Sequence, residues 1–133
     1  MAGNYEQYYD LSGIVEDVMD SSGVTPGSTV WGDSLSEKED DARQHFAIPR
    51  DDEVFLVLDT TLFGSCKVGL ALTTSGVCMR DEDGAVRRVE WYELRDGADF
   101  SYGGGTLTID DSKFFSADGE YIYKILNEVV AEL

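Results

Sequence analysis

The sequence predicts an α+β fold: a seven-stranded antiparallel barrel or sandwich, capped by a C-terminal helix and preceded by one or two N-terminal helices. Three observations support this. Apolar residues recur at helical spacing near both ends of the chain. Short apolar or alternating runs fill residues 53–116, and turn residues separate them closely. The 133 residues are 42% apolar, which is enough for one buried core.

Residues 4–20 are expected to form the first helix. Asn4 can cap it, and Gln7 stands at the reciprocal position of a capping box. One apolar stripe follows at helical spacing: Tyr8, Leu11, Ile14, Val15 and Val18. Residues 21–34 are rich in glycine, serine and threonine, which predicts a loop or linker.

A second, short helix is expected over residues 36–46. Ser36 and Glu39 have the spacing of a capping box, and Pro49 follows the end of the helix. We therefore divide the chain into an N-terminal helical extension and linker, residues 1–47, and a main domain, residues 48–133. The main domain is expected to fold without the first helix.

Seven strands are predicted in the main domain. The first is a continuous apolar run, which is typical of a strand covered on both faces. The turn at residues 74–76 and the acidic turn at residues 81–84 separate later strands. The strands are expected near residues 54–58, 68–72, 77–79, 86–91, 100–102, 106–109 and 113–115.

Residues 117–132 are expected to form the C-terminal helix, which would close the open end of the barrel. Ser116 is the predicted cap, and Asp118 and Glu120 lie in the first turn, where the helix dipole favours acids. Its apolar stripe consists of Ile122, Ile125, Leu126, Val129 and Leu133.

The two cysteines are predicted to be free, small core residues. Cys66 and Cys78 flank a hairpin, and counting outward from its turn places Cys78 opposite Leu72 instead of Cys66. Residues 1–10 lack the features of a signal peptide, and no apolar run reaches the roughly 20 residues that span a bilayer. We therefore expect a cytoplasmic protein.

Several short motifs of the main domain resemble those of bacterial pleckstrin-homology-like (PH-like) domains. They are Ile48-Pro49 with Glu53, then Asp-Thr-Thr-Leu-Phe-Gly-Ser at 59–65, Gly-Leu-Ala-Leu-Thr at 69–73, Gly76-Val77, and Val-Glu-Trp-Tyr-Glu-Leu at 89–94. The resemblance covers about residues 46–133 and implies a seven-stranded PH-like barrel with a C-terminal helix. Such domains bind lipids, peptides or proteins, and the fold alone does not choose among these.

Charge narrows the ligand class. The chain has 27 acidic and 10 basic residues, a formal net charge of −17. Such a field repels nucleic acids and anionic membranes and attracts basic proteins. The alternative explanation of the charge is that it keeps the protein soluble and has no further role. Lys67 is the only base between residues 60 and 67, so the basic loop of lipid-binding PH domains is missing and phosphoinositide binding is not expected.

No catalytic residue, metal or cofactor is predicted. His45 is the only histidine, and with Cys66 and Cys78 it falls short of four zinc ligands. Residues 79–90 place some acids at calcium-loop spacing, but Met79 occupies the first ligand position and the flanks are strands.

The function predicted from the sequence is that of a non-catalytic, acidic module that binds or inhibits a basic protein. In its most concrete form it is an immunity protein that neutralises a bacterial toxin by occlusion. The alternative is a small carboxylate-based enzyme or an enzyme accessory subunit, which would need two buried carboxylates of raised pKa in a closed pocket.

The acidic surface near the first helix and the loop that follows it is the predicted docking site. The apolar stripe of this helix needs cover, either from the barrel wall or from a partner. An acidic rim surrounds that stripe and would select a basic partner: Glu6, Asp10, Glu16, Asp17 and Asp20.

Overall fold

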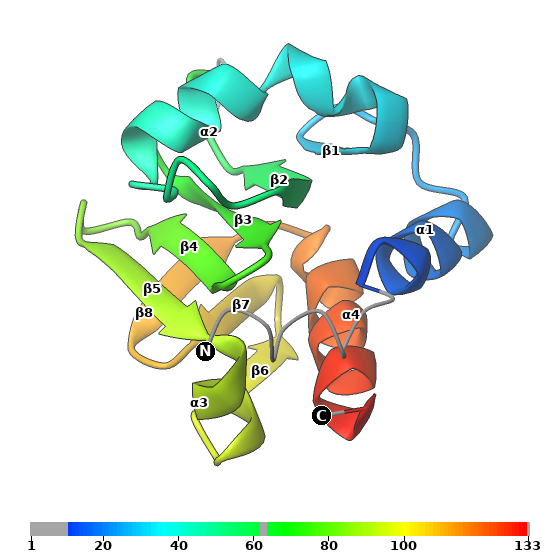
Figure 1. Ribbon diagram of the computed structural model, residues 1–133, viewed down its shortest axis with the longest axis vertical. Coiled ribbons are helices and arrows are strands. Elements are labelled where there is room, and N and C mark those ends of the chain that lie inside the picture. Colours follow the sequence, from blue (N-terminus) through cyan, green and yellow to red (C-terminus); the bar gives the residue numbers. More distant parts are fainter. Residues whose placement is uncertain (1–10, 62–63, 133) are drawn as a thin grey trace.

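Two antiparallel sheets form the centre of the protein in the computed structural model, which describes residues 11–61 and 64–132 (Figure 1). The larger sheet has the strand order β1-β2-β3-β4-β5. Its strands are β1 (Thr29–Trp31), β2 (Val54–Asp59), β3 (Gly69–Thr73), β4 (Gly76–Arg80) and β5 (Val86–Glu90). The smaller sheet consists of β6 (Phe100–Gly103), β7 (Thr106–Ile109) and β8 (Ser112–Phe115).

Helices cover these sheets from several sides (Figure 1). They are α1 (Leu11–Ser21), the 3-10 helix η2 (Gly32–Glu37), α2 (Glu39–His45), α3 (Trp91–Arg95) and α4 (Gly119–Glu132). The first helix packs on α4 and β2, whereas η2 and α2 contact β2 from the other side of the sheet. Within the described ranges, no helix has both the length and the apolar character needed to cross a membrane.

The α+β class, the antiparallel pairing and the C-terminal helix are confirmed, and each of the seven predicted strands has a counterpart. The two sheets are not joined into a closed barrel, since α3 separates β5 from β6. The prediction of a loop throughout residues 21–34 is wrong, because β1 lies there and pairs with β2. Three residues are too few to show a strand alternation in the sequence. The predicted boundary at residues 47 and 48 falls between these two paired strands.

Strands β1 to β4 of the larger sheet are buried on both faces, whereas β5 is largely exposed. Leu56, Leu58 and Leu70 point into one apolar cluster together with residues of α1, α4 and the smaller sheet. Val57 and Ala71 point the opposite way, into a second cluster beneath α2. Alternate residues of a strand face opposite sides, so cover on both sides accounts for the continuous apolar run of β2.

The first helix belongs to the core. Its buried residues are Leu11, Ile14, Val15, Val18 and Met19, and they join the cluster that includes α4 and β2. The open question of what covers the stripe is therefore answered within the chain. The expectation that this helix is additional to the fold is wrong. Asn4, Gln7 and Tyr8 lie outside the described residues, as does Leu133 of the C-terminal stripe.

The hairpin between β3 and β4 is one residue tighter than predicted. Cys78 lies opposite Ala71, and Leu72 lies opposite Val77. The reason is Gly76, which belongs to the strand instead of the turn. A Cβ at Gly76 would lie 2.2 Å from the carbonyl oxygen of Val89, so only glycine fits there.

Two further elements differ from the predictions. The single helix expected over residues 36–46 is two helices, η2 and α2, which meet at Lys38, where φ is −134°. Trp91 does not extend β5 but begins α3, and its indole nitrogen donates to the carbonyl of Thr73 at 2.9 Å. The C-terminal helix begins at Gly119, two residues later than predicted. Ser116 lies in the turn before it, where its hydroxyl accepts from the backbone N–H of Asp118 at 3.1 Å.

We predict that Met19→Ala lowers the free energy of unfolding by about 2–5 kcal/mol, because Met19 is 0% exposed and the substitution leaves a cavity. Asp17→Ala on the exposed face of the same helix should change it by less than about 0.5 kcal/mol. Urea unfolding followed by circular dichroism measures both. Equal, negligible effects would mean that α1 does not contribute to the core.

Candidate functional site

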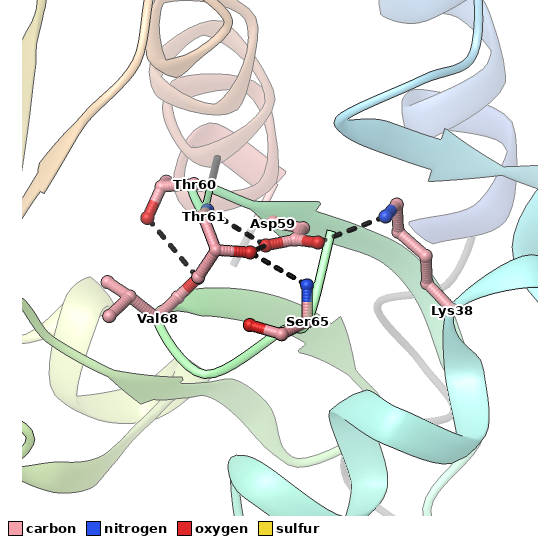
Figure 2. A network of polar contacts seen from close by, with 6 residues as sticks. All are labelled: Lys38, Asp59, Thr60, Thr61, Ser65 and Val68. Carbon is pink, nitrogen blue, oxygen red and sulfur yellow. Dashed lines mark hydrogen bonds and ion pairs between the residues drawn. The ribbon is translucent and has the colours of Figure 1, made fainter. Parts of the chain in front are cut away.

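A buried carboxylate, Asp59, organises the end of β2 (Figure 2). The residue is 1% exposed. Its Oδ2 accepts a hydrogen bond from Lys38 Nζ at 3.0 Å, which is also an ion pair. Its Oδ1 accepts from the backbone N–H of Thr61 at 2.9 Å and from the Thr61 hydroxyl at 2.5 Å. Both carboxylate oxygens therefore have hydrogen-bond donors within the protein.

The same network shapes the loop that follows β2. The Thr61 hydroxyl oxygen accepts from the backbone N–H of Ser65 at 2.9 Å. Thr60 closes the base of the loop, since its backbone N–H and its hydroxyl donate to the carbonyl of Val68 at 3.0 and 3.2 Å (Figure 2). Gly64 has φ +74°, and a Cβ there would lie 3.3 Å from Lys38 Nζ. The loop is thus folded around Asp59 and the lysine that crosses to it.

The environment of Asp59 keeps it ionised. Burial by itself raises the pKa of this carboxyl group, but the hydrogen bonds from Thr61 and Lys38 and the positive charge of Lys38 more than offset it. The net result is a pKa below the ordinary value of 3.8. Lys38 lies between η2 and α2, so this ion pair fastens the helical cover to the sheet.

Cys66 lies in the same neighbourhood and is completely buried, with φ +57°. Burial and the nearby negative charge of Asp59 raise the pKa of its thiol to about 12. Such a thiol is protonated at neutral pH, and the thiolate is the form that attacks electrophiles. Lysine, aspartate, threonine and cysteine are residue types of many active sites, but here they form a structural clip. Both cysteines are free and buried, as predicted.

The sequence interpretation treated residues 59–65 as a family motif and missed this network. One signal was available, because an aspartate followed by threonines at a strand end favours a turn closed by the side chain. Lys38 had no such signal, since it precedes Asp59 by 21 residues.

A second buried carboxylate, Asp81, also accepts backbone hydrogen bonds from the turn that follows its strand. It is 5% exposed, and its Oδ1 accepts from the backbone N–H groups of Asp83 and Ala85, both at 3.0 Å. The predicted hairpin turn is confirmed. In the part of the chain that the structure describes, no group of three or more histidine, cysteine or acidic side chains is arranged to hold a metal ion.

His45 is half-buried at the end of α2, and its Nδ1 has no hydrogen-bond partner among the described residues. Close to it in sequence is an open groove of about 500 Å³, lined by Asp40, Arg43, Gln44, Ile48 and Arg50. Arg43 is already engaged there, because it pairs with Glu39 at 2.9 Å and donates to the carbonyl of Asp52 at 2.8 Å.

The predicted docking site is present in part. Glu16, Asp17 and Asp20 are exposed on α1, and Asp20 Oδ1 accepts from the Trp31 indole at 3.2 Å. Glu6 and Asp10 lie outside the described residues. The apolar centre that the rim would surround is covered by α4 and β2, so it cannot contact a partner.

Charge is distributed unevenly over the surface. Within residues 11–53, Arg50 is the only base in the exposed class, and Lys38, Arg43 and His45 are half-buried. We call the exposed acids of this stretch the acidic layer. They belong to α1 on one face of the larger sheet, to η2 and α2 on the other, and to the segment after α2: Glu16, Asp17, Asp20, Asp33, Glu37, Asp40, Asp41, Asp51 and Glu53. Exposed acids and bases are mixed over residues 54–132, where the exposed bases are Lys67, Arg87, Arg88, Arg95, Lys113 and Lys124. The acidic layer follows α1, η2 and α2, at the right and top of Figure 1.

Comparison of the chain with protein-family models, with curated proteins and with solved structures finds no significant match.

We predict that Lys38→Met lowers the free energy of unfolding at pH 7 by about 1.5–3 kcal/mol, because it leaves a buried carboxylate without its charged donor. The folded pKa of Asp59 lies below 3.8, so the contribution of the ionised group is complete above that pH and is lost as pH falls through the folded pKa. The difference between wild type and variant should therefore shrink in acid. Urea unfolding from pH 7 to pH 3 measures it.

Lys67→Met is the matched control for this prediction, because Lys67 is an exposed lysine of the same loop. It should change stability by less than about 0.5 kcal/mol. If both lysine variants behave alike, the Asp59 clip does not hold the helical cover.

We also predict that neither cysteine reacts with iodoacetamide at pH 8 while the protein is folded. The pKa of Cys66 is about 12, and burial raises the pKa of Cys78 above its ordinary value of 9.0. Mass spectrometry should show two alkylated thiols only after denaturation. Rapid alkylation of the folded chain, or a two-dalton loss that indicates a disulfide, would contradict this prediction.

Proposed function

We propose that this chain is a non-catalytic protein-binding module whose acidic layer binds a basic protein. The observation that carries the proposal is the uneven surface charge, with exposed acids along α1, η2 and α2 and Arg50 as the single exposed base within residues 11–53. Concentrating like charges costs stability through self-repulsion. An acidic surface of this kind speeds association with a basic partner and selects against acidic ones.

Apolar contact must supply part of the affinity, because rim charges act mainly on the association rate. The stripe of α1 is not available for this, since the chain itself covers it. Leu35 of η2 is a better candidate. It is half-buried and lies between the exposed Asp33 and Glu37 in the sequence. An apolar side chain with acidic neighbours has the composition of an interface centre with a charged rim.

In its most concrete form, the proposed function is that of an immunity protein that occludes a basic bacterial toxin. Small size and strong net negative charge, −17 here, suit tight and fast association with such a partner. The same charge disfavours nucleic acids, anionic membranes and phosphoinositides.

The alternative, a carboxylate-based enzyme, is less well supported. The buried carboxylates of the described residues are Asp59 and Asp81. The first has a lowered pKa and the second accepts two backbone hydrogen bonds in its own turn. A catalytic pair would need one carboxyl group of raised pKa beside an ionised one.

We predict that reversing charges in the acidic layer abolishes capture of a basic partner. The test variant is Glu16→Lys, Asp17→Lys and Glu37→Lys. The control carries Glu82→Lys, Asp99→Lys and Asp111→Lys, which are exposed acids outside the layer, and it has the same net charge. Immobilised protein is incubated with lysate of the source organism at about 0.05 M salt, where surface charges are weakly screened.

Wild type and control should retain the same basic protein, and the test variant should not. Capture should weaken as salt rises toward about 0.5 M, because screening shortens the range of charge attraction. Equal capture by the test and control variants would reject the acidic layer as the binding surface. Capture of acidic proteins alone would reject the proposed class of partner.

A further inference from the structure

The outer edge of β5 is open in the described structure. β5 is the last strand of the larger sheet and pairs with β4 alone. The backbone N–H of Asp81 donates to the carbonyl of Ala85, and that of Trp91 donates to the carbonyl of Ser75. These two bonds show which residue pairs of the β4–β5 hairpin are hydrogen-bonded. Hydrogen-bonded pairs alternate along an antiparallel ladder. Met79–Arg87 and Val77–Val89 are therefore the bonded pairs, and the backbone groups of Val86 and Arg88 point away from β4.

The side chains along this edge are exposed and basic. Val86 is 48% exposed, and Arg87 and Arg88 are also exposed. Neither arginine forms an ion pair with a described residue, although the chain carries 27 acids. Arg80 is half-buried opposite Val86, and its Nε has no hydrogen-bond partner among the described residues. Three arginines thus lie at one hairpin, and none of them forms an ion pair with a carboxylate of the described residues.

The register places these arginines on both faces of the edge. Arg80 and Arg88 lie diagonally across the ladder on one face, where neighbours are about 7–8 Å apart. Arg87 points to the opposite face. A strand added beside β5 would therefore lie next to two guanidinium groups, that of Arg88 on one face of the sheet and that of Arg87 on the other. Two adjacent acids in such a strand would be paired, one on each side.

We propose that the free edge of β5 binds an extended segment of a partner protein that carries adjacent acidic residues, by strand addition. Backbone hydrogen bonds to Val86 and Arg88 supply the affinity, and the arginines select the charge. A second copy of the chain does not fit, because two-fold antiparallel pairing centred on Arg88 sets Arg88 against itself, and like charges directly opposite are destabilising. This surface is distinct from the acidic layer and binds the opposite charge.

The net charge of −17 does not prevent this contact at physiological salt. The Debye length is about 8 Å at 0.15 M, so distant acids are screened while the arginines at the edge act directly. The exposed acids nearest in sequence, Glu82 and Asp83, lie in the turn beyond the strand. They limit the docked segment to the length of β5.

The probe is the six-residue peptide Thr-Val-Glu-Glu-Val-Thr with blocked ends, titrated into ¹⁵N-labelled full-length protein at about 0.15 M salt. The backbone amide signals of Val86 and Arg88 should shift and exchange with solvent more slowly. The control peptide carries two lysines in place of the two glutamates and should shift neither signal. The absence of any shift with the acidic peptide at millimolar concentration would overturn the proposal. The arginines would then be interpreted as charges that prevent edge-to-edge pairing of β5.

Protein variants separate the two contributions. Arg88→Glu should weaken binding of the acidic peptide at least tenfold. Lys113→Glu, the same charge change at an exposed base of β8, should leave it within about twofold. Arg88→Pro removes the outward N–H without breaking the ladder to β4, and proline is tolerated on edge strands. It should weaken binding more than Arg88→Ala does.

Two outcomes count against the proposal at this stage. Equal binding by the Arg88→Glu and Lys113→Glu variants would overturn it, and that pair decides the matter even if Arg88→Pro does not fold. A dimer in sedimentation that Arg88→Glu dissociates would assign the edge to a second copy instead. Neither result bears on the acidic layer, because its test uses a basic partner and different variants.

Discussion

The constraint on which the structure depends is that the central strands of the larger sheet, β2 to β4, are buried on both faces. Each face must be covered, because exposing it would leave most of the core side chains in water. α1, α4 and the smaller sheet cover one face, and η2 with α2 covers the other. This explains why residues before β2 are needed at all. They are the cover of a sheet that begins with their own strand, β1, and they carry the acidic layer on their outer side.

The ion pair between Lys38 and Asp59 connects that cover to the sheet. Asp59 is 1% exposed and Lys38 is 15% exposed, so the pair lies where the helical layer meets the end of β2. An ion pair in such a position adds little net stability compared with an apolar contact, but removing one partner is costly. Its value here is positional. It holds η2 and α2, and therefore the exposed acids beside Leu35, in one place relative to the core. The network at Asp59 thus serves the proposed binding surface without touching a partner.

Two surfaces of opposite sign result from this arrangement. Acids predominate on the covering helices, whereas unpaired arginines gather at the β4–β5 hairpin, where the sheet is left open. Head-to-tail contact between copies would join the two surfaces, and open contacts of that kind can propagate into filaments. The net charge of −17 opposes such contact. The two proposed binding surfaces therefore carry opposite charges, and the net negative charge disfavours contact between copies.

The sequence by itself determined the seven strands of residues 54–115, the C-terminal helix, the apolar stripe of α1 and the two free cysteines. These are consequences of periodicity, caps and turns, which are local. Only the tertiary structure decided three features. They are the elements that cover the stripe of α1, the formation of a strand at residues 29–31, and the choice of Lys38 as the partner of Asp59. It also placed Trp91 at the start of a helix. It left β5 as an edge strand of the larger sheet, where a seven-stranded barrel or sandwich was expected. These features depend on contacts between residues far apart in the chain, and such pairings leave no periodic signal in the sequence.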